Sequence, residues 1–522
     1  MDRISQLPDF IVHHILSFLK TPKDLVRMSV LSKTWLHLTA SFPILDFSIS
    51  DFSSGESFFS YVEYTTSRFC HQNLPAHSLR LIKFLRDPAD LDIVDRCLER
   101  VFRNGVKELV IYLHNYSDYS EPPSDSEESA SDYEESPSAT AMPRYRLPNT
   151  LLSVSVLTSL TIFGCDLPSS FMLDALKFKS LTRLKLENIH IDDEVITYLA
   201  TSCPLLQVFE IRSCPGFKRF CVHGHQSLQE VDISFDAPVE RIDIEAPNLY
   251  ELSVADEGET GQPQMNLALC EKLTSVSCEG CPLPNDFLSN FPFVENLVLF
   301  TGYNGNNLKL SSNSLRTLVL NSDFDLEEIE LSTPSLGLFI YSYNEHYSGL
   351  GISHLPHLEL CMRCYLDDSI DSLWFQKLRL FLDKENGFKA LNLYICTDQK
   401  LTVLEKLKAV ELPPYELEHI ELHFEHEESS GHATFVDAVL CCFCPRSLTL
   451  RSSFPLTTFE EQSPLVKFTY EKLLEQEFQG QTSIQIVSPY STKAQKQFKG
   501  LMSLPRSLPR QEKAISFIKE EE

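Results

Sequence analysis

The chain has 522 residues, of which 73 are Asp or Glu and 45 are Lys or Arg, so its formal net charge is −28. This length allows several domains or one long repeat array, and the acidity disfavours partners with phosphate backbones or anionic membrane surfaces. No apolar run approaches the roughly 18–20 residues that a membrane span needs, and we expect no secretory signal, because no basic stretch precedes an apolar core. Fifteen cysteines, an odd number scattered along the chain, predict free thiols and therefore a location in the cytoplasm or nucleus.

The first 45 residues predict three short helices. Pro8 suits the first turn of the first helix, Thr21-Pro22 interrupts the pattern, residues 23–30 form a second run, and Ser32 can cap a third helix that carries Trp35. Steps of three and four residues place one apolar stripe on the first helix, formed by Leu7, Ile11, Ile15, Phe18 and Leu19. Three short helices make a poor independent core, so the stripe predicts a partner protein. The alternative is an ordinary helical cap that buries the stripe.

This segment resembles the F-box. The matching positions are Leu7-Pro8, Ile11, Ile15-Leu16, Leu19, Arg27, Val30-Leu31-Ser32-Lys33 and Trp35. The resemblance implies that residues 1–48 dock onto the Skp-type adaptor of a cullin–RING ubiquitin ligase. The residues that it implies for docking are Leu7, Pro8, Ile11, Ile15, Leu16, Leu19, Val30, Leu31, Ser32, Lys33, Trp35 and Leu38.

Residues 49–455 carry a repeat with the pattern apolar-x-x-apolar-x-apolar. Copies begin at Leu157, Leu181, Leu206, Leu228, Leu249, Leu273, Val294, Leu315, Leu336 and Leu355. This period is that of leucine-rich repeats, whose single copies cannot bury their apolar residues but whose stacks can. We therefore predict an α/β fold in which a curved leucine-rich-repeat solenoid follows the three N-terminal helices.

The repeat pattern varies along the chain. Earlier copies are expected at Leu79/Ile82/Phe84 and Val106/Leu109/Ile111, and later copies begin at Phe388 and Leu417, with a last one at Leu448/Leu450. Within residues 231–254 and 318–341, a second group of apolar residues follows each repeat motif, which predicts outer strands in place of outer helices. Residues 116–141 contain eight acidic and no basic side chains, which predicts a disordered insert within one repeat. Residues 456–522 are predicted to form a helix and a polar tail.

Two features allow a metal-site interpretation. Cys278-x-x-Cys281 and Cys361-x-x-Cys364 have the spacing of zinc ligands, but Cys165 and Cys214, like Cys281, follow their repeat motifs by three residues, where repeats favour a small buried group. Structural cysteines are therefore preferred, with no metal. The histidines and glutamates of residues 416–432 could form a metal or pH-sensitive patch, but we expect His419, Glu421 and His423 to lie on a solvated strand face.

The order of elements and the closing phrases FVDAVLCCFCPRSLTL and FTYEKLLEQE resemble plant F-box/leucine-rich-repeat proteins. The resemblance implies a non-catalytic, substrate-recognising subunit of a ubiquitin ligase that reaches cullin and RING proteins through the adaptor. No nucleotide, hydrolase or zinc-protease motif contradicts this, and no cofactor is predicted. Exposed strand positions predicted to contact a target protein are Lys185, Glu210, Asp232 and Ser253. A ligand-gated receptor of the same fold and an interaction scaffold unrelated to ubiquitin are the alternatives.

Overall fold

The structure, a computed structural model, contains two compact units, residues 1–273 and 274–522. It describes residues 7–19, 22–48, 52, 54–73, 75–85, 88–115, 144–172, 178–258, 261, 263–281, 287–301, 308–322, 329–342, 361–366, 372–384, 387–395, 413–424, 430–452, 464–476, 483–487 and 513–520. The predicted acidic insert at 116–141 lies outside these residues. In the described part, no helix is long and apolar enough to cross a membrane.

The first unit begins with the three predicted helices, α1 (Asp9–Leu16), α2 (Pro22–Ser29) and α3 (Lys33–Ala40). The Ser32 side chain caps α3 as predicted, because its Oγ accepts a hydrogen bond from the Trp35 amide at 3.2 Å. Pro8 is the residue before α1, and its carbonyl accepts the first bonds of that helix. A small core, made of Val12, Leu16, Trp35, Leu38 and Phe42, holds the helices together.

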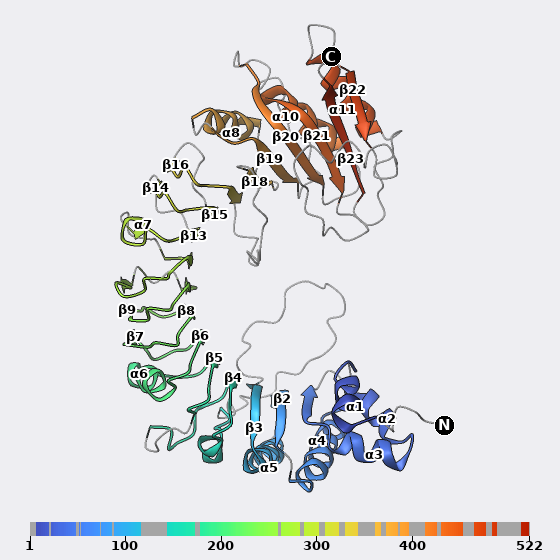
Figure 1. Cartoon of the computed structure of the whole chain (residues 1–522), viewed down its shortest axis with the longest axis vertical. Coiled ribbons are helices and arrows are strands. Elements are labelled where there is room, and N and C mark those ends of the chain that lie inside the picture. Colours follow the sequence, from blue (N-terminus) through green and yellow to red (C-terminus); the bar gives the residue numbers. More distant parts are fainter. Residues whose placement is uncertain are drawn as a thin grey trace, which may run out of the picture. The chain divides into compact units, whose positions relative to one another are not determined.

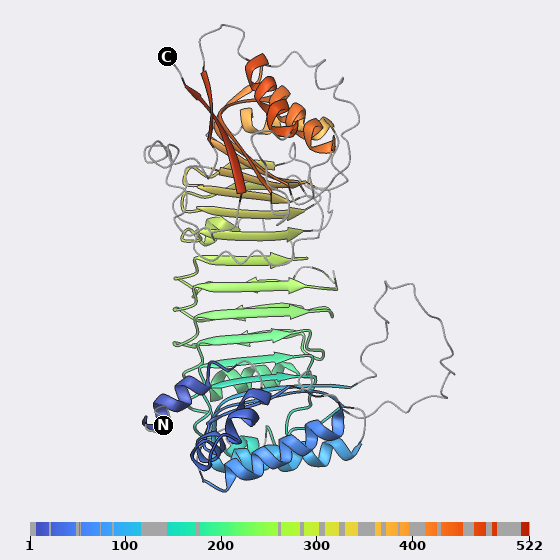
Figure 2. The same ribbon diagram turned by 90° about the vertical axis from the view of Figure 1, so that its right-hand side faces the viewer.

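A parallel sheet follows the helices (Figures 1 and 2). Each of its strands pairs with the next one named. The strands are β1 (Ile44–Ser48), β2 (Ala76–Leu85), β3 (Val106–Asn115), β4 (Ser159–Phe163), β5 (Arg183–Glu187), β6 (Val208–Arg212), β8 (Glu230–Phe235) and β10 (Glu251–Asp256). Since β1 belongs to the segment predicted as residues 1–48, the sheet starts within that segment.

The return segments of this unit change in character along the chain. Helices α4 (Gly55–Cys70), α5 (Pro88–Asn104) and α6 (Asp193–Ser202) and the short helix η4 (Asn149–Ser153) come first. Outer strands follow as a small parallel sheet of β7 (Arg219–Val222), β9 (Arg241–Ile244) and β11 (Gln264–Asn266), of which β9 lies within the range predicted to contain an outer strand. In Figure 1, α6, β7 and β9 lie along one side of β5, β6 and β8.

The repeat pattern produces this arrangement because successive strand residues point to opposite faces. Leu184 and Leu186 of β5 are at most 1% exposed, while Lys185 between them lies on the opposite face. Gly164, after β4, is required by close packing, since its φ is +67° and a Cβ there would come within 2.4 Å of the Leu113 carbonyl oxygen.

The second unit contains parallel strands that again pair with one another in chain order. These strands are β12 (Ser275–Glu279), β13 (Asn296–Thr301), β15 (Thr317–Ser322), β17 (Leu338–Ser342), β18 (Cys361–Leu366), β19 (Ala390–Ile395), β20 (Tyr415–Phe424) and β21 (Phe443–Ser452). Outer strands β14 (Leu308–Ser311) and β16 (Ile329–Ser332) pair with each other, and the helices are α7 (Phe287–Asn290), α8 (Ser372–Lys384), α10 (Ser430–Cys442) and α11 (Pro464–Glu475).

The C-terminal region corrects the expectation of a polar tail after the predicted helix. Strand β23 (Lys513–Glu520) pairs antiparallel with β21, and β22 (Ser483–Val487) pairs antiparallel with β23. Ile515 and Phe517 of β23 are each 1% exposed. They alternate with polar residues in the sequence and are buried because β23 pairs with β21 at the edge of the sheet.

One repeat copy differs in register from the prediction, and another lies outside the described residues. In β2 the buried positions are Ala76, Leu79 and Leu81, not Ile82, because Leu79 pairs with Leu109 of β3. In β18 the buried positions are Met362 and Cys364, whereas the predicted copy at Leu355/Leu358/Leu360 lies outside the described residues. The mixed α/β fold with a large parallel sheet agrees with the prediction, and the curvature of the array stays a prediction.

Phe209 of β6 and Phe220 of β7 connect the main sheet to the outer strands, with ring centroids 5.6 Å apart and no exposed surface. We expect Phe209→Ala to lower the free energy of unfolding by about 3–5 kcal/mol, because the substitution leaves a cavity between the two sheets. Urea unfolding followed by circular dichroism measures this change. Leu205→Ala, at a side chain that is 51% exposed, serves as the control and should change stability little; equal losses in the two variants would contradict the packing role of Phe209.

Candidate functional site

The N-terminal helices expose an unusual number of large apolar side chains. Phe10, Phe18, Val30 and Leu31 are 69%, 71%, 79% and 62% exposed. Together with less exposed neighbours they form what we call the N-terminal apolar face, consisting of Leu7, Phe10, Ile15, Phe18, Val26, Val30, Leu31 and Leu36. Apolar groups gathered on so small a module are typical of a surface that another protein covers.

The structure divides the predicted docking residues into two groups. Those that are exposed are Leu7, Pro8, Ile15, Val30, Leu31, Ser32 and Lys33, and those that are partly buried are Ile11 and Leu19. Leu16, Trp35 and Leu38 are at most 5% exposed and belong to the core between the helices. These three residues therefore hold the helices together, and their predicted contact with a partner stays a prediction.

Sequence reasoning missed Phe10, Val26 and Leu36. A signal for the first of these was present, since Phe10 and Phe18 lie two helical turns apart and define a second apolar line on the first helix. The predicted stripe included Phe18 but not Phe10. Val26 and Leu36 lie on the second and third helices, which are too short for the spacing of apolar residues to define an exposed side.

The predicted target contacts lie in one row across the first sheet. Lys185 pairs in register with Glu210, Glu210 with Asp232, and Asp232 with Ser253. We call the sheet face that carries this row the strand face of the first unit; it contains the alternate residues of β5, β6, β8 and β10 that point away from the buried leucines. Four neighbouring strands thus bring together residues that are separated by more than twenty positions in the chain.

Ion pairs link most of this row. Lys185 Nζ lies 3.1 Å from Glu187 Oε2 and 3.7 Å from Glu210 Oε2, and Arg212 contacts both Glu210 and Asp232. The Arg212 pKa is raised, because its neighbouring carboxylates outweigh the effect of burial. These side chains are partly exposed, so each pair contributes little to stability and can exchange its partner.

The row of ion pairs ends at β10. Glu251 of β10 pairs in register with Glu230 of β8, which places two like charges opposite each other. Partial burial raises the pKa of Glu251, and the nearby carboxylates of Glu230 and Asp232 add to the effect. The strand face therefore changes from ion pairs that link β5, β6 and β8 to a pair of neighbouring carboxylates on β8 and β10.

The corresponding face of the second unit is of a different kind. Its side chains include Val298, Val319, Leu338, Ile340 and Ala390, which form an apolar cluster and are 3–8% exposed. These positions are buried, and the row that contains Ile340 continues in register through Arg363 and Asn392 to Glu421.

The expectation of a solvated histidine and glutamate face on β20 is wrong. Glu421 is 7% exposed and lies between Arg451 Nε and His423 Nε2, at 2.5 and 2.8 Å from its Oε1 atom, and the His423 ring stacks on Tyr394. Burial alone would raise the pKa of Glu421, but hydrogen bonds from His419 and His423 and the charge of Arg451 hold it well below its usual range. The adjacent parallel strand supplies Arg451, which the sequence spacing does not reveal.

The cysteines of the repeat motif occupy buried turns, as their register predicts. Cys165 and Cys214 are at most 2% exposed, and the Cys214 thiol lies 3.3 Å from the Arg212 carbonyl oxygen. Burial raises the pKa of Cys214 to about 12, so this thiol stays protonated at neutral pH. Within the described residues, no group of three or more His, Cys, Asp or Glu side chains is arranged to hold a metal ion.

Comparisons with known proteins match both regions. Residues 4–45 match the family described as F-box-like, and residues 136–278 match the leucine-rich repeats of FBD-associated F-box protein At5g56370. The second match covers the strands that carry the charged row.

Relatives in Arabidopsis thaliana are named as F-box or F-box/LRR-repeat proteins. Putative F-box/LRR-repeat protein At5g54820 is 30% identical over 45% of this chain and 50% of its own length. Putative F-box protein At3g58860 is 27% identical over 51% of this chain and 54% of its own length. F-box/LRR-repeat protein At1g06630 is 28% identical over 51% of this chain and 62% of its own length. The chain thus spans between half and two thirds of the length of these relatives.

The Glu421 network predicts a pH dependence of stability. Because the folded state holds the pKa of Glu421 below its ordinary value of about 4.3, its contribution to stability is present above that pH and is lost as the pH falls further. We expect Glu421→Gln to lower the free energy of unfolding at pH 7 by about 3 kcal/mol, since Arg451 stays buried without its carboxylate, and to reduce the loss between pH 5 and pH 3. Urea unfolding at several pH values measures both effects. Glu271→Gln, at an exposed site, is the control, and a Glu421→Gln variant with the wild-type pH profile would contradict the prediction.

Proposed function

We propose that this chain, which is similar to plant F-box/leucine-rich-repeat proteins in both its N-terminal helices and its repeats, is the substrate-recognition subunit of a cullin–RING ubiquitin ligase. The N-terminal apolar face docks a Skp-type adaptor, and through it the chain reaches cullin and RING proteins. The strand face of the first unit binds the target protein. The observation that carries this proposal is the exposure of the N-terminal apolar face in a segment that matches the F-box-like family.

Adaptor docking is supported by the amount of apolar surface on three short helices. Covering a Val, Leu or Phe side chain contributes about 1.5–3 kcal/mol, so several such residues together are sufficient for a stable complex even after the loss of rotational freedom. Val30 and Leu31 lie between α2 and α3, and Phe10 and Phe18 lie at the two ends of α1. A partner that contacts all four residues must cover the three helices together.

Target binding at the strand face of the first unit is supported by its accessibility and its polarity. Its ion pairs are partly exposed and individually weak, so a target with complementary charges can replace them at low cost. A face of paired and unpaired charges also rejects partners that would leave a charge without a counter-ion.

The mechanism needs no reacting group from this chain. Proteins of the F-box/leucine-rich-repeat type are generally adaptors without catalysis of their own. Holding a target beside a charged ubiquitin-conjugating enzyme raises the effective concentration of its lysines, which makes the transfer a nearly intramolecular reaction. The proposal places this activity in the cytoplasm or nucleus.

The first test measures adaptor binding by the full chain. We expect Val30→Asp to weaken the complex with a purified Skp-type adaptor at least about tenfold, because a charge replaces an apolar contact at the centre of the N-terminal apolar face. Leu7→Ala combined with Pro8→Ala should weaken it as well. Isothermal titration calorimetry gives the dissociation constants.

Val156→Asp introduces the same charge at an exposed apolar position of the first unit, outside the N-terminal helices, and should bind the adaptor normally. If the wild-type chain does not bind the adaptor, the proposal fails and the chain is an interaction scaffold.

The second test concerns the target. In a full chain with Val30→Asp, targets should accumulate on the strand face, and quantitative mass spectrometry of captured plant proteins identifies them. Adding Lys185→Ala with Asp232→Ala, which leaves the net charge unchanged, should reduce their capture about tenfold by removing two contacts of the row. Lys218→Ala with Glu240→Ala removes an equally neutral pair from the outer side of the repeats and is the matched control. Unchanged capture by the first pair would contradict target binding at this face.

A further inference from the structure

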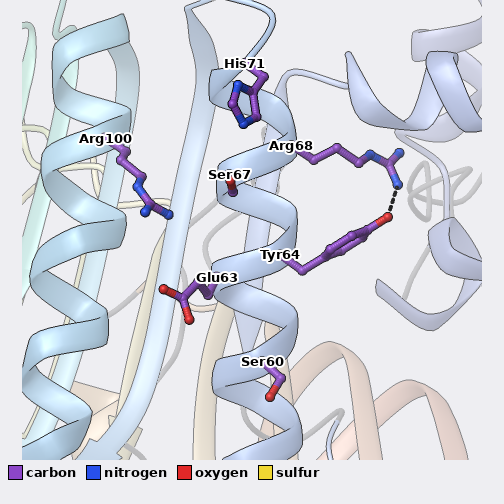
Figure 3. A pocket seen from close by; sticks show the side chains of 7 residues that line it. All are labelled: Ser60, Glu63, Tyr64, Ser67, Arg68, His71 and Arg100. Atoms are coloured by element: carbon purple, nitrogen blue, oxygen red, sulfur yellow. Dashed lines mark hydrogen bonds between the residues drawn. The ribbon is translucent and has the colours of Figure 1, made fainter.

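A shallow groove crosses α4 and α5, the two helices that follow the N-terminal module. It has a volume of about 560 Å³ and is lined by Ser60, Glu63, Tyr64, Ser67, Arg68, His71 and Arg100 (Figure 3). All but Arg100 come from α4 or the residue after it, and Arg100 reaches the groove from α5. Neither the F-box-like match nor the repeat match covers these residues.

Arg68 connects this groove to the N-terminal module. Its Nη2 donates hydrogen bonds to the Leu36 carbonyl oxygen at 2.8 Å and to Thr39 Oγ1 at 3.0 Å, both in α3, while its Nη1 lies 3.4 Å from the Tyr64 hydroxyl. The guanidinium also lies 5.6 Å from the centre of the Tyr64 ring. Tyr64 is 60% exposed, so Arg68 links an accessible aromatic ring to the backbone of α3, the helix that carries Leu36 of the N-terminal apolar face.

The groove is cationic, although the chain as a whole is strongly acidic. Arg68 and Arg100 line it, and its one carboxylate, that of Glu63, is 3.3 Å from Arg96. Arg103, one turn further along α5, is paired with Glu99 at 2.9 Å. Among the described residues, Arg100 makes no such ion pair, which leaves its charge available to a partner.

These observations define one surface that continues from the N-terminal apolar face through Leu36 and Arg68 to Tyr64 and Arg100. We propose that the footprint of the Skp-type adaptor extends beyond the F-box-like helices onto this groove, where an acidic segment of the adaptor pairs with Arg100 and packs on Tyr64. This inference rests on the proposed function. It adds a contact that depends on charge to docking that is otherwise apolar, and thereby increases specificity and the rate of association.

The test compares single-charge variants of the full chain in binding to the purified adaptor. We expect Arg100→Gln to weaken binding about three- to tenfold and Arg100→Glu to weaken it further, with a larger effect at 50 mM than at 500 mM salt because added ions screen the interaction. Tyr64→Ala should also weaken binding. Surface plasmon resonance separates association from dissociation.

Arg103→Gln removes an equal charge from the same helix outside the groove and should bind the adaptor as the wild type does. Phe293→Ala, at another aromatic side chain that is 63% exposed, is the control for Tyr64→Ala. Circular dichroism should show that all variants are folded.

If Arg100→Gln and Tyr64→Ala bind like the wild type, or if Arg103→Gln is weakened as much as Arg100→Gln, the extended footprint is refuted while adaptor docking by the N-terminal apolar face stands. If the wild-type chain does not bind the adaptor, the proposed function and this extension both fail.

Discussion

The structure depends on a buried row of apolar side chains that neighbouring repeats share. Leu184 and Leu186 have no core within their own repeat and become buried only because Leu160 and Ile162 precede them and Phe209 and Ile211 follow. A repeat stack is stable because each interface completes the core of the next copy. The same requirement holds the register of the strands, since a shift by one residue would turn every leucine toward solvent.

This fixed register determines what the chain can offer to other proteins. With alternate residues committed to the core, the residues between them form a second face, and parallel pairing without offset brings Lys185, Glu210 and Asp232 into one row. In the second unit the same positions carry Val319, Leu338 and Ile340, so an identical backbone arrangement produces a buried apolar face. The difference in chemistry between the two units therefore comes from side chains at positions that the core does not use.

The N-terminal helices differ from the repeats, because their core is small and leaves large apolar side chains exposed. They are stabilised by attachment to the following elements. Strand β1 joins the sheet beside β2, and Arg68 of α4 bonds to the last turns of α3. Both attachments hold the N-terminal helices against the first elements of the sheet unit.

Periodicity by itself determined the three helices, the repeat copies from Leu157 to Leu336 and the outer strands, because a spacing of three to four residues or an alternation of two reports directly on local geometry. It failed where several registers were equally apolar, as in β2, and where a strand obtains its core from a distant partner, as β23 does from β21. Only the tertiary structure showed that Leu16, Trp35 and Leu38 are core residues, that Glu421 is buried beside Arg451, and that Arg68 links Tyr64 to the backbone of α3. The physical reason is the same in each case: exposure and charge pairing depend on neighbours across strands and helices, whose proximity no spacing along the chain encodes.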